Sequence, residues 1–187
     1  MKTGINRKTP TAGIAAAVLI GLIVPGYFPA ISADKRESVE TRLARLEDRE
    51  EIRQLLNDYG RYLDQRDFAS FSQLFSEKEG EWIGGMGKAQ GRQAIKKLMD
   101  DTIGSDKSGK IGGPNYHLFM NEIISVKGNE GKALTKWMFV VQNSSKQPQP
   151  FYLGHYEDSL VREQGRWKFL KRVVYSDIPA EDPLARK

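Results

Sequence analysis

The second half of the chain contains four long segments in which apolar and polar residues alternate, spanning 116–126, 133–142, 151–162 and 166–176. Each stretch between them is short and contains glycine or proline. Alternation with a period of two is typical of β-strands whose two faces meet different surroundings. Because short turns join antiparallel neighbours, the pattern predicts a meander of four antiparallel strands.

The first half has a helical pattern instead. Between Ser38 and Leu63, apolar residues recur every three or four positions, which predicts a long amphipathic helix buried on one side. The stripe consists of Val39, Leu43, Leu46, Ile52, Leu55, Leu56, Tyr59 and Leu63. Asp67 is predicted to cap a second helix over residues 68–75, whose phenylalanines would point inward.

Shorter features connect these two halves. Residues 81–86 predict a strand, residues 91–99 predict a third helix, and the polar stretch 102–114 predicts a loop that could close over a site. The tail, residues 179–187, is expected to be irregular or a short closing segment. Helices followed by strands indicate an α+β fold, in which a curved antiparallel sheet wraps around about three N-terminal helices.

The N-terminus has the pattern of a secretory signal peptide. Lys2, Arg7 and Lys8 precede an apolar stretch over residues 13–24, and small residues follow at 30–33. The pattern predicts a signal peptide over residues 1–33 and a single domain over 34–187, exported to the periplasm or secreted. The apolar stretch is shorter than the ~20 residues that span a bilayer, which favours cleavage over the alternative, an uncleaved membrane tether.

The distribution of charge and the absence of cysteine argue against several classes of function. Three of the charges behind the formal net charge of +5 lie in the predicted signal peptide. In the remainder, lysine and arginine are mixed with acidic residues and form no patch with stacking aromatics, so no nucleic-acid partner is expected. The chain has no cysteine, which excludes disulfides and thiolate chemistry.

The two histidines, His117 and His155, are the side chains best suited to acid–base chemistry at neutral pH. His117 begins the first long strand, on a face predicted to include Phe119, Asn121 and Ile123. A wrapped sheet would bring this strand end to Asp64, at the end of the first helix. An aspartate that accepts a hydrogen bond from one imidazole nitrogen makes the other a better base. The alternative is a structural hydrogen bond between helix and sheet.

Four short motifs resemble the SnoaL-like branch of the nuclear transport factor 2 superfamily. They are Leu63–Phe68, Tyr116–His117 with Asn121 following, Gly154–Asp158 and Gly165–Phe169. The resemblance covers roughly residues 40–178. It implies a cystatin-like α+β roll, in which a cone-shaped sheet wraps around the helices and encloses a deep apolar pocket.

Scytalone dehydratase and hexachlorocyclohexane dehydrochlorinase belong to this branch and use an Asp–His pair to abstract a proton in an elimination. The resemblance assigns these roles to Asp64 and His117. Arg172, which matches an arginine of the dehydrochlorinase, or a tyrosine such as Tyr59 or Tyr62 would stabilise developing negative charge. Tyr59 stands where the dehydrochlorinase has a lysine, and the second histidine of the dehydratase falls near Lys136 or Trp137. Neither enzyme's substrate can therefore be transferred.

Aromatic and polar residues around the predicted pair are candidates for substrate contact. They are Tyr59, Tyr62, Trp82, Asn121, Trp137, Phe139 and Tyr156. Aromatic residues in helices and strands more often serve core packing. His155 alternates with Leu153 and Glu157, so its side chain could simply face solvent or the sheet surface. No ligand spacing supports a metal site and no glycine-rich motif supports a cofactor.

The sequence therefore predicts a cofactor-independent lyase or isomerase, resembling a dehydratase, that acts on a small and largely apolar molecule. The alternative is an exported small-molecule-binding or dimerisation module without chemistry, because one fold serves many functions. A homodimer formed through the outer face of the sheet is implied by the resemblance.

Overall fold

The computed structural model describes residues 37–104 and 114–184. The predicted signal peptide and most of the predicted loop 102–114 lie outside these residues, so both stay predictions. The helices are α1 (Val39–Gln65), α2 (Phe68–Gln73) and α3 (Arg92–Thr102). The strands are β1 (Glu81–Gly84), β2 (Gly87–Gln90), β3 (Asn115–Lys127), β4 (Glu130–Gln142), β5 (Pro148–Glu163), β6 (Arg166–Ile178) and β7 (Ala180–Glu181).

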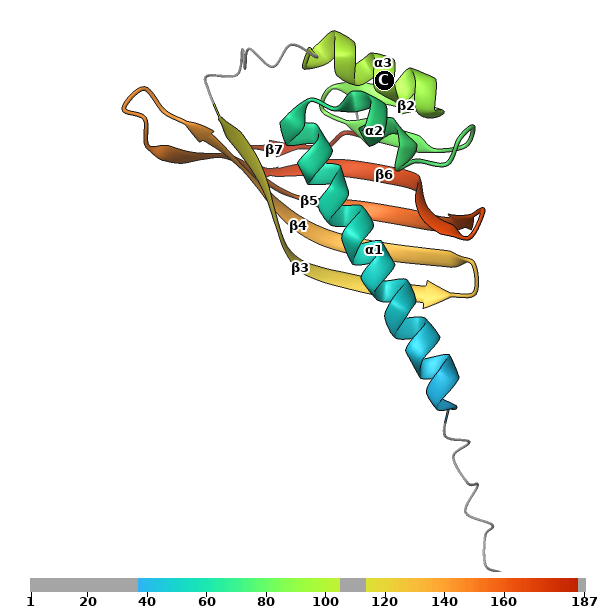
Figure 1. The fold of residues 1–187 in the computed structure, drawn as a ribbon. Coiled ribbons are helices and arrows are strands. Elements are labelled where there is room, and N and C mark those ends of the chain that lie inside the picture. The colour runs from blue at the N-terminus through green and yellow to red at the C-terminus, as the bar shows by residue number, and fades with distance from the viewer. Residues whose placement is uncertain (1–36, 105–113, 185–187) are drawn as a thin grey trace, which may run out of the picture. The chain divides into compact units, whose positions relative to one another are not determined.

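Within the described residues the strands form one open sheet in the order β2-β1-β6-β5-β4-β3, and β7 also pairs with β6 (Figure 1). Strands β3 to β6 form the predicted antiparallel meander. The sheet is not wholly antiparallel, however, because β1 runs parallel to β6. The connection from β1 to β6 passes through most of the domain, and a long connection permits parallel pairing where a tight turn does not.

The predicted strand over residues 81–86 is a hairpin rather than one strand. Strand β1 ends at Gly84, and β2 returns beside it from Gly87 to Gln90. Gly87 has a φ of +128°, a conformation that glycine adopts readily and other residues avoid. The short β2 sequence lacks β-branched and aromatic residues, so nothing in it predicted a strand.

Helix α1 is buried along only part of its length. Its N-cap, Ser38, accepts a hydrogen bond from the Thr41 backbone N–H. Val39, Leu43 and Leu46 are 71%, 53% and 61% exposed, so the prediction that they join the buried stripe was wrong. This part of α1 projects past the sheet (Figure 1), and the buried residues begin at Ile52.

The core lies between the helices and one face of the sheet and is rich in aromatic rings. Its fully enclosed side chains include Tyr59, Phe68, Phe71, Phe75, Tyr156, Trp167 and Phe169. As predicted, Asp67 caps α2 by accepting a hydrogen bond from the Ser70 backbone N–H at 3.0 Å. Burying several large rings supplies most of the driving force that holds this sheet against α1.

A β-bulge in β3 changes which residues face this core. The register pairs Met120 with Lys136 but Ile123 with Leu134, so β3 contains one extra residue. Beyond the bulge Ile124 is buried and Ile123 is 66% exposed. The prediction that Asn121 and Ile123 share the face of His117 was therefore wrong, because a bulge shifts the alternation of side chains by one residue.

Candidate active site

The candidate site begins at the last turn of α1, where Asp64 faces β3. One turn earlier, Gly60 allows the helix to approach the strand closely. A Cβ at Gly60 would lie 2.7 Å from the ring of Phe119 and 3.5 Å from the Cβ of His117. A side chain at Gly60 would therefore displace the Phe119 ring or push α1 away from β3, so this glycine permits the close approach of Asp64 and His117.

The structure brings Asp64 and His117 together. The imidazole Nδ1 and the carboxylate Oδ1 are 2.6 Å apart, and the backbone N–H of His117 donates to Oδ2 at 3.0 Å. A carboxylate can only accept, so Nδ1 carries the hydrogen, and in the neutral imidazole Nε2 then has the lone pair. The side chains are 13% and 20% exposed, which shields the pair from bulk water without sealing it.

Aromatic side chains surround the imidazole. The ring centroids of Phe139 and Trp137 lie 4.7 Å and 6.3 Å from that of His117. Trp137 in turn stacks on Tyr156 at 5.5 Å and 16°. Trp137 lies across Gly154, where a Cβ would come within 2.8 Å of the indole. Three predicted contact residues thus form a continuous aromatic row that begins at His117.

Tyr156, at the far end of this row, is a buried tyrosine. The residue is 2% exposed, and its hydroxyl makes no hydrogen bond with any residue that the structure describes. Burial raises the pKa of Tyr156 well above its ordinary value; Tyr59, Asp158 and, least of all, Asp64 add to this effect, and Arg172 opposes it. Tyr156 is therefore a neutral hydrogen-bond donor within the electrostatic influence of the Asp64 carboxylate.

Arg172 is enclosed rather than open to a ligand. Its side chain is fully buried, and its Nε and Nη2 donate to the two carboxylate oxygens of Asp158, each at 2.7 Å. The guanidinium carbon lies 4.0 to 4.2 Å from the ring centroids of Tyr59, Tyr156 and Phe169. Burial lowers the pKa of Arg172, but Asp158 outweighs this and the pKa is raised. The third guanidinium nitrogen, Nη1, is buried and makes no hydrogen bond with the residues that the structure describes.

The other predicted contact residues are placed differently. Tyr59 and Trp82 are both 2% exposed, and the Trp82 Nε1–H donates a hydrogen bond to the Tyr59 hydroxyl at 2.9 Å. Tyr62 is half-buried beneath the guanidinium of Arg61. Asn121 is exposed at the bulge with a φ of +55°. Of these four side chains, Tyr59 contacts the row that starts at His117, since its ring packs edge-on against Tyr156 at 5.5 Å between centroids.

His155 lies on the outer face of the sheet, as the solvent-facing reading of the sequence expected. Its Nδ1 is 2.9 Å and 3.0 Å from the two carboxylate oxygens of Asp177, and its ring stacks on Tyr175 at 4.6 Å. Sequence reasoning missed Asp177. It faces the same side as Tyr175 two residues earlier, but only the register of β5 and β6 reveals that His155 is adjacent.

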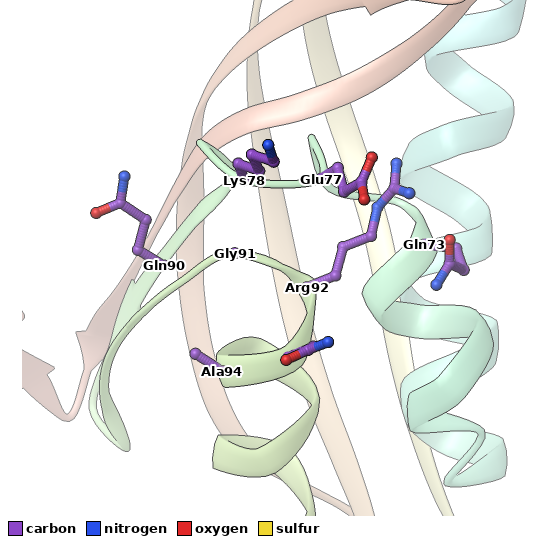
Figure 2. A pocket seen from close by; sticks show the side chains of 8 residues that line it. Gln73, Glu77, Lys78, Gln90, Gly91, Arg92 and Ala94 are labelled. Atoms are coloured by element: carbon purple, nitrogen blue, oxygen red, sulfur yellow. The ribbon is translucent and has the colours of Figure 1, made fainter.

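A surface hollow of about 700 Å³ lies at the start of α3, between α2 and the β1–β2 hairpin (Figure 2). Most of its lining residues are of polar types, and they are Gln73, Glu77, Lys78, Gln90, Gly91, Arg92, Gln93 and Ala94. Arg92 is already engaged there, since its Nε donates to the Phe75 carbonyl at 2.8 Å. None of the sequence-predicted site residues lines this hollow, so the candidate site stays at the Asp64 end of α1.

Among residues 37–104 and 114–184, no cluster of three or more histidine and acidic side chains could hold a metal ion. No helix in the same part of the chain is both long and apolar enough to cross a membrane.

Solved structures with a similar arrangement of helices and sheet identify the fold class of this chain. The chain is similar to an NTF2-like protein with a cystatin-like fold from Novosphingobium aromaticivorans, with a TM-score of 0.65, 26% identity, and coverage of 76% of this chain and 90% of that one. A proposed scytalone dehydratase from the same organism matches at a TM-score of 0.59 and 23% identity, covering 80% of this chain and 99% of that one. The fold is therefore the cystatin-like fold of NTF2-like proteins.

Within this class the chain belongs to the SnoaL-like domain family, whose sequence pattern matches residues 44–173 of this chain. A curated relative is an uncharacterised protein of Mycobacterium tuberculosis, 27% identical over 134 residues, which cover 70% of this chain and 86% of the relative. The expected superfamily and fold are thus confirmed.

Proposed function

We propose that this protein is a cofactor-independent lyase or isomerase that removes a proton from a small, largely apolar molecule. The observation that carries the proposal is the 2.6 Å contact between His117 Nδ1 and Asp64, on an imidazole that lies beside the rings of Phe139 and Trp137. Membership of the SnoaL-like family and the similar fold of a proposed scytalone dehydratase support it.

The roles follow from the geometry. His117 Nε2 takes a proton from a carbon atom, and Asp64 stabilises the imidazolium that forms. In an elimination the C–H electron pair becomes a C=C bond, and a hydroxyl on the next carbon leaves as water with the proton from His117. In an isomerisation the same proton returns to a different carbon. Neither reaction is a net oxidation or reduction, so the proposal needs no redox cofactor.

The binding-module alternative also has a specific observation in its favour. Across the outer sheet face the register aligns Leu118, Met138, Leu153 and Ile178 in one apolar row. Leu118 and Ile178 are 48% and 63% exposed. A row of this kind suits a homodimer in which the domain binds or assembles without chemistry.

Deuterium exchange into candidate substrates distinguishes the lyase or isomerase from the binding module. A panel of small aromatic β-hydroxyketones is incubated with the protein in D₂O, and NMR follows deuterium entry beside the carbonyl and loss of water. We expect exchange with the wild type, a fall of about 10²–10⁴-fold in His117→Ala, and no change in the matched control His155→Ala. Exchange that persists in folded His117→Ala would exclude His117 as the base. Ligand uptake without exchange in the wild type would favour the binding module.

A further inference from the structure

The N-terminal part of helix α1 stands clear of the rest of the domain. Every residue from 37 to 47 is exposed, whereas the buried residues of α1 begin at Ile52. Roughly two and a half helical turns therefore project past the sheet (Figure 1). This part of α1 gains none of the packing from which most helical stability in proteins comes. A partner helix would supply it.

The exposed apolar residues of this part do not continue the buried stripe of α1. Val39, Leu43 and Leu46 are all more than half exposed, and they follow each other at intervals of four and three residues. Leu46 and Ile52 are six positions apart, an interval that turns the helix by about 240°. The exposed stripe thus lies about 120° around α1 from the buried residues, so a helix laid along it need not displace the sheet.

The spacing of the exposed stripe is that of a coiled-coil seam, in which apolar residues alternate at intervals of four and three. In heptad notation Val39 and Leu46 take position d, and Leu43 takes position a between them. The flanking positions e and g are all charged. They are Glu40 and Glu47 at e, and Arg42 and Arg49 at g.

The order of these charges sets the orientation of a partner helix. In a parallel pair of helices, each g residue faces the e residue five positions later in the other helix. Arg42 then faces Glu47 of a second copy, and two-fold symmetry forms this ion pair twice. In an antiparallel pair g faces g and e faces e, which opposes arginine to arginine and glutamate to glutamate. The charges therefore favour a parallel pair.

Arg42 and Glu47 have no competing partner in the part of the chain that the structure describes. Neither side chain makes a hydrogen bond or an ion pair with a residue in that part. Arg45, on another side of the same helix, is by contrast already paired with Glu37 at 2.7 Å. The two charges that would meet in a parallel pair are thus available to a second copy.

We propose that the projecting part of α1, residues 39–49, forms a parallel two-stranded coiled coil with the same segment of a second copy of this chain. Val39, Leu43 and Leu46 form its seam, and the ion pairs between Arg42 and Glu47 fix the parallel orientation. The contact uses no residue of the outer sheet face. The inference is independent of the proposed function, because neither Asp64 nor His117 takes part in it.

Cysteine cross-linking of the full chain tests the contact, since the native sequence has no cysteine. Single cysteines are introduced by Val39→Cys, by Leu46→Cys and, as a matched control, by Thr41→Cys, which lies about 160° around the helix from Leu43. In a parallel pair each seam cysteine meets the same cysteine of the other copy. We expect both seam variants to form disulfide-linked dimers about ten-fold faster than the control under the same mild oxidation.

Charge reversal in the Leu46→Cys variant tests the orientation. Arg42→Glu sets glutamate against Glu47 of the other copy and should slow cross-linking about five-fold. Adding Glu47→Arg restores the attraction, so the double reversal should recover the rate. Within its own helix the new glutamate lies three residues from Arg45, an attractive spacing, so a slower rate cannot come from a weaker helix.

Three outcomes would overturn the proposal. Equal cross-linking rates in the seam and control variants exclude the coiled coil, and are expected if a lipid surface, residues 1–36 or a dimer through the outer sheet face is the actual contact. Cross-linking that requires a mixture of Val39→Cys and Leu46→Cys excludes the parallel orientation, because these positions meet in an antiparallel pair. A rate unmoved by Arg42→Glu excludes the ion pairs that fix the orientation.

Discussion

The domain contains two His–Asp pairs, one on each face of its sheet. The inner pair, His117 with Asp64, joins β3 to the end of α1 with a 2.6 Å contact and side chains 13% and 20% exposed. The outer pair, His155 with Asp177, joins β5 to β6 at 2.9 Å, and its side chains are 28% and 48% exposed. The two pairs have the same chemistry in different surroundings.

The difference shows that the pair alone does not define a site. The inner imidazole faces Phe139 and Trp137, which exclude water and strengthen its interaction with Asp64. The outer imidazole stacks on Tyr175 at a surface where solvent weakens ion pairs. Only the inner pair has the surroundings that proton abstraction from an apolar molecule requires.

The largest expected contrast is in rate. In Asp64→Asn the side chain keeps its shape but loses the charge that stabilises the imidazolium, and its amide can favour the wrong tautomer. Deuterium exchange or turnover should fall about 10²–10⁴-fold. Asp177→Asn should leave the rate within about two-fold of the wild type, because a surface pair contributes little. Equal losses in the two variants would show that the pairs do not differ in function.

A smaller contrast is expected in stability. Asp64→Ala removes two hydrogen bonds and leaves the backbone N–H of a part-buried residue unpaired, so the free energy of unfolding should fall by about 1–3 kcal/mol. Asp177→Ala should cost about 0–1 kcal/mol, since both partners are solvated. Urea unfolding monitored by tryptophan fluorescence measures both values. A larger loss of unfolding free energy in Asp177→Ala than in Asp64→Ala would contradict the expectation that the inner pair contributes more to stability.

Much of the fold could be predicted because its signals are local. The alternating segments gave the four-strand meander, and Asp67 preceding a phenylalanine-rich stretch gave the cap of α2. The parallel pairing of β1 with β6 and the short β2 could not be predicted, because they depend on which strand edge is left free after the helices pack.

The candidate site was predictable in part, although its central contact joins residues far apart in the sequence. The contact of Asp64 with His117 follows from a helix end and a strand end meeting, and the glycine at position 60 explains how closely they meet. The placement of Asn121 was not predictable, because one extra residue in β3 reverses its face. Nor was the enclosure of Arg172, which depends on three rings from separate elements closing around the Asp158 ion pair.

The most direct test of the central claim is the tautomer of His117 and its response to a ligand. Long-range ¹H–¹⁵N NMR of the imidazoles at pH 8, assigned with His117→Ala and His155→Ala, is recorded with and without acetophenone. We predict a hydrogen on Nδ1 and a bare Nε2 in His117, with an Nε2 resonance that moves when the probe binds, while the His155 signals stay still. A hydrogen on Nε2 of His117, or an Nε2 resonance indifferent to the bound probe, would contradict the account of His117 as the base of a ligand site.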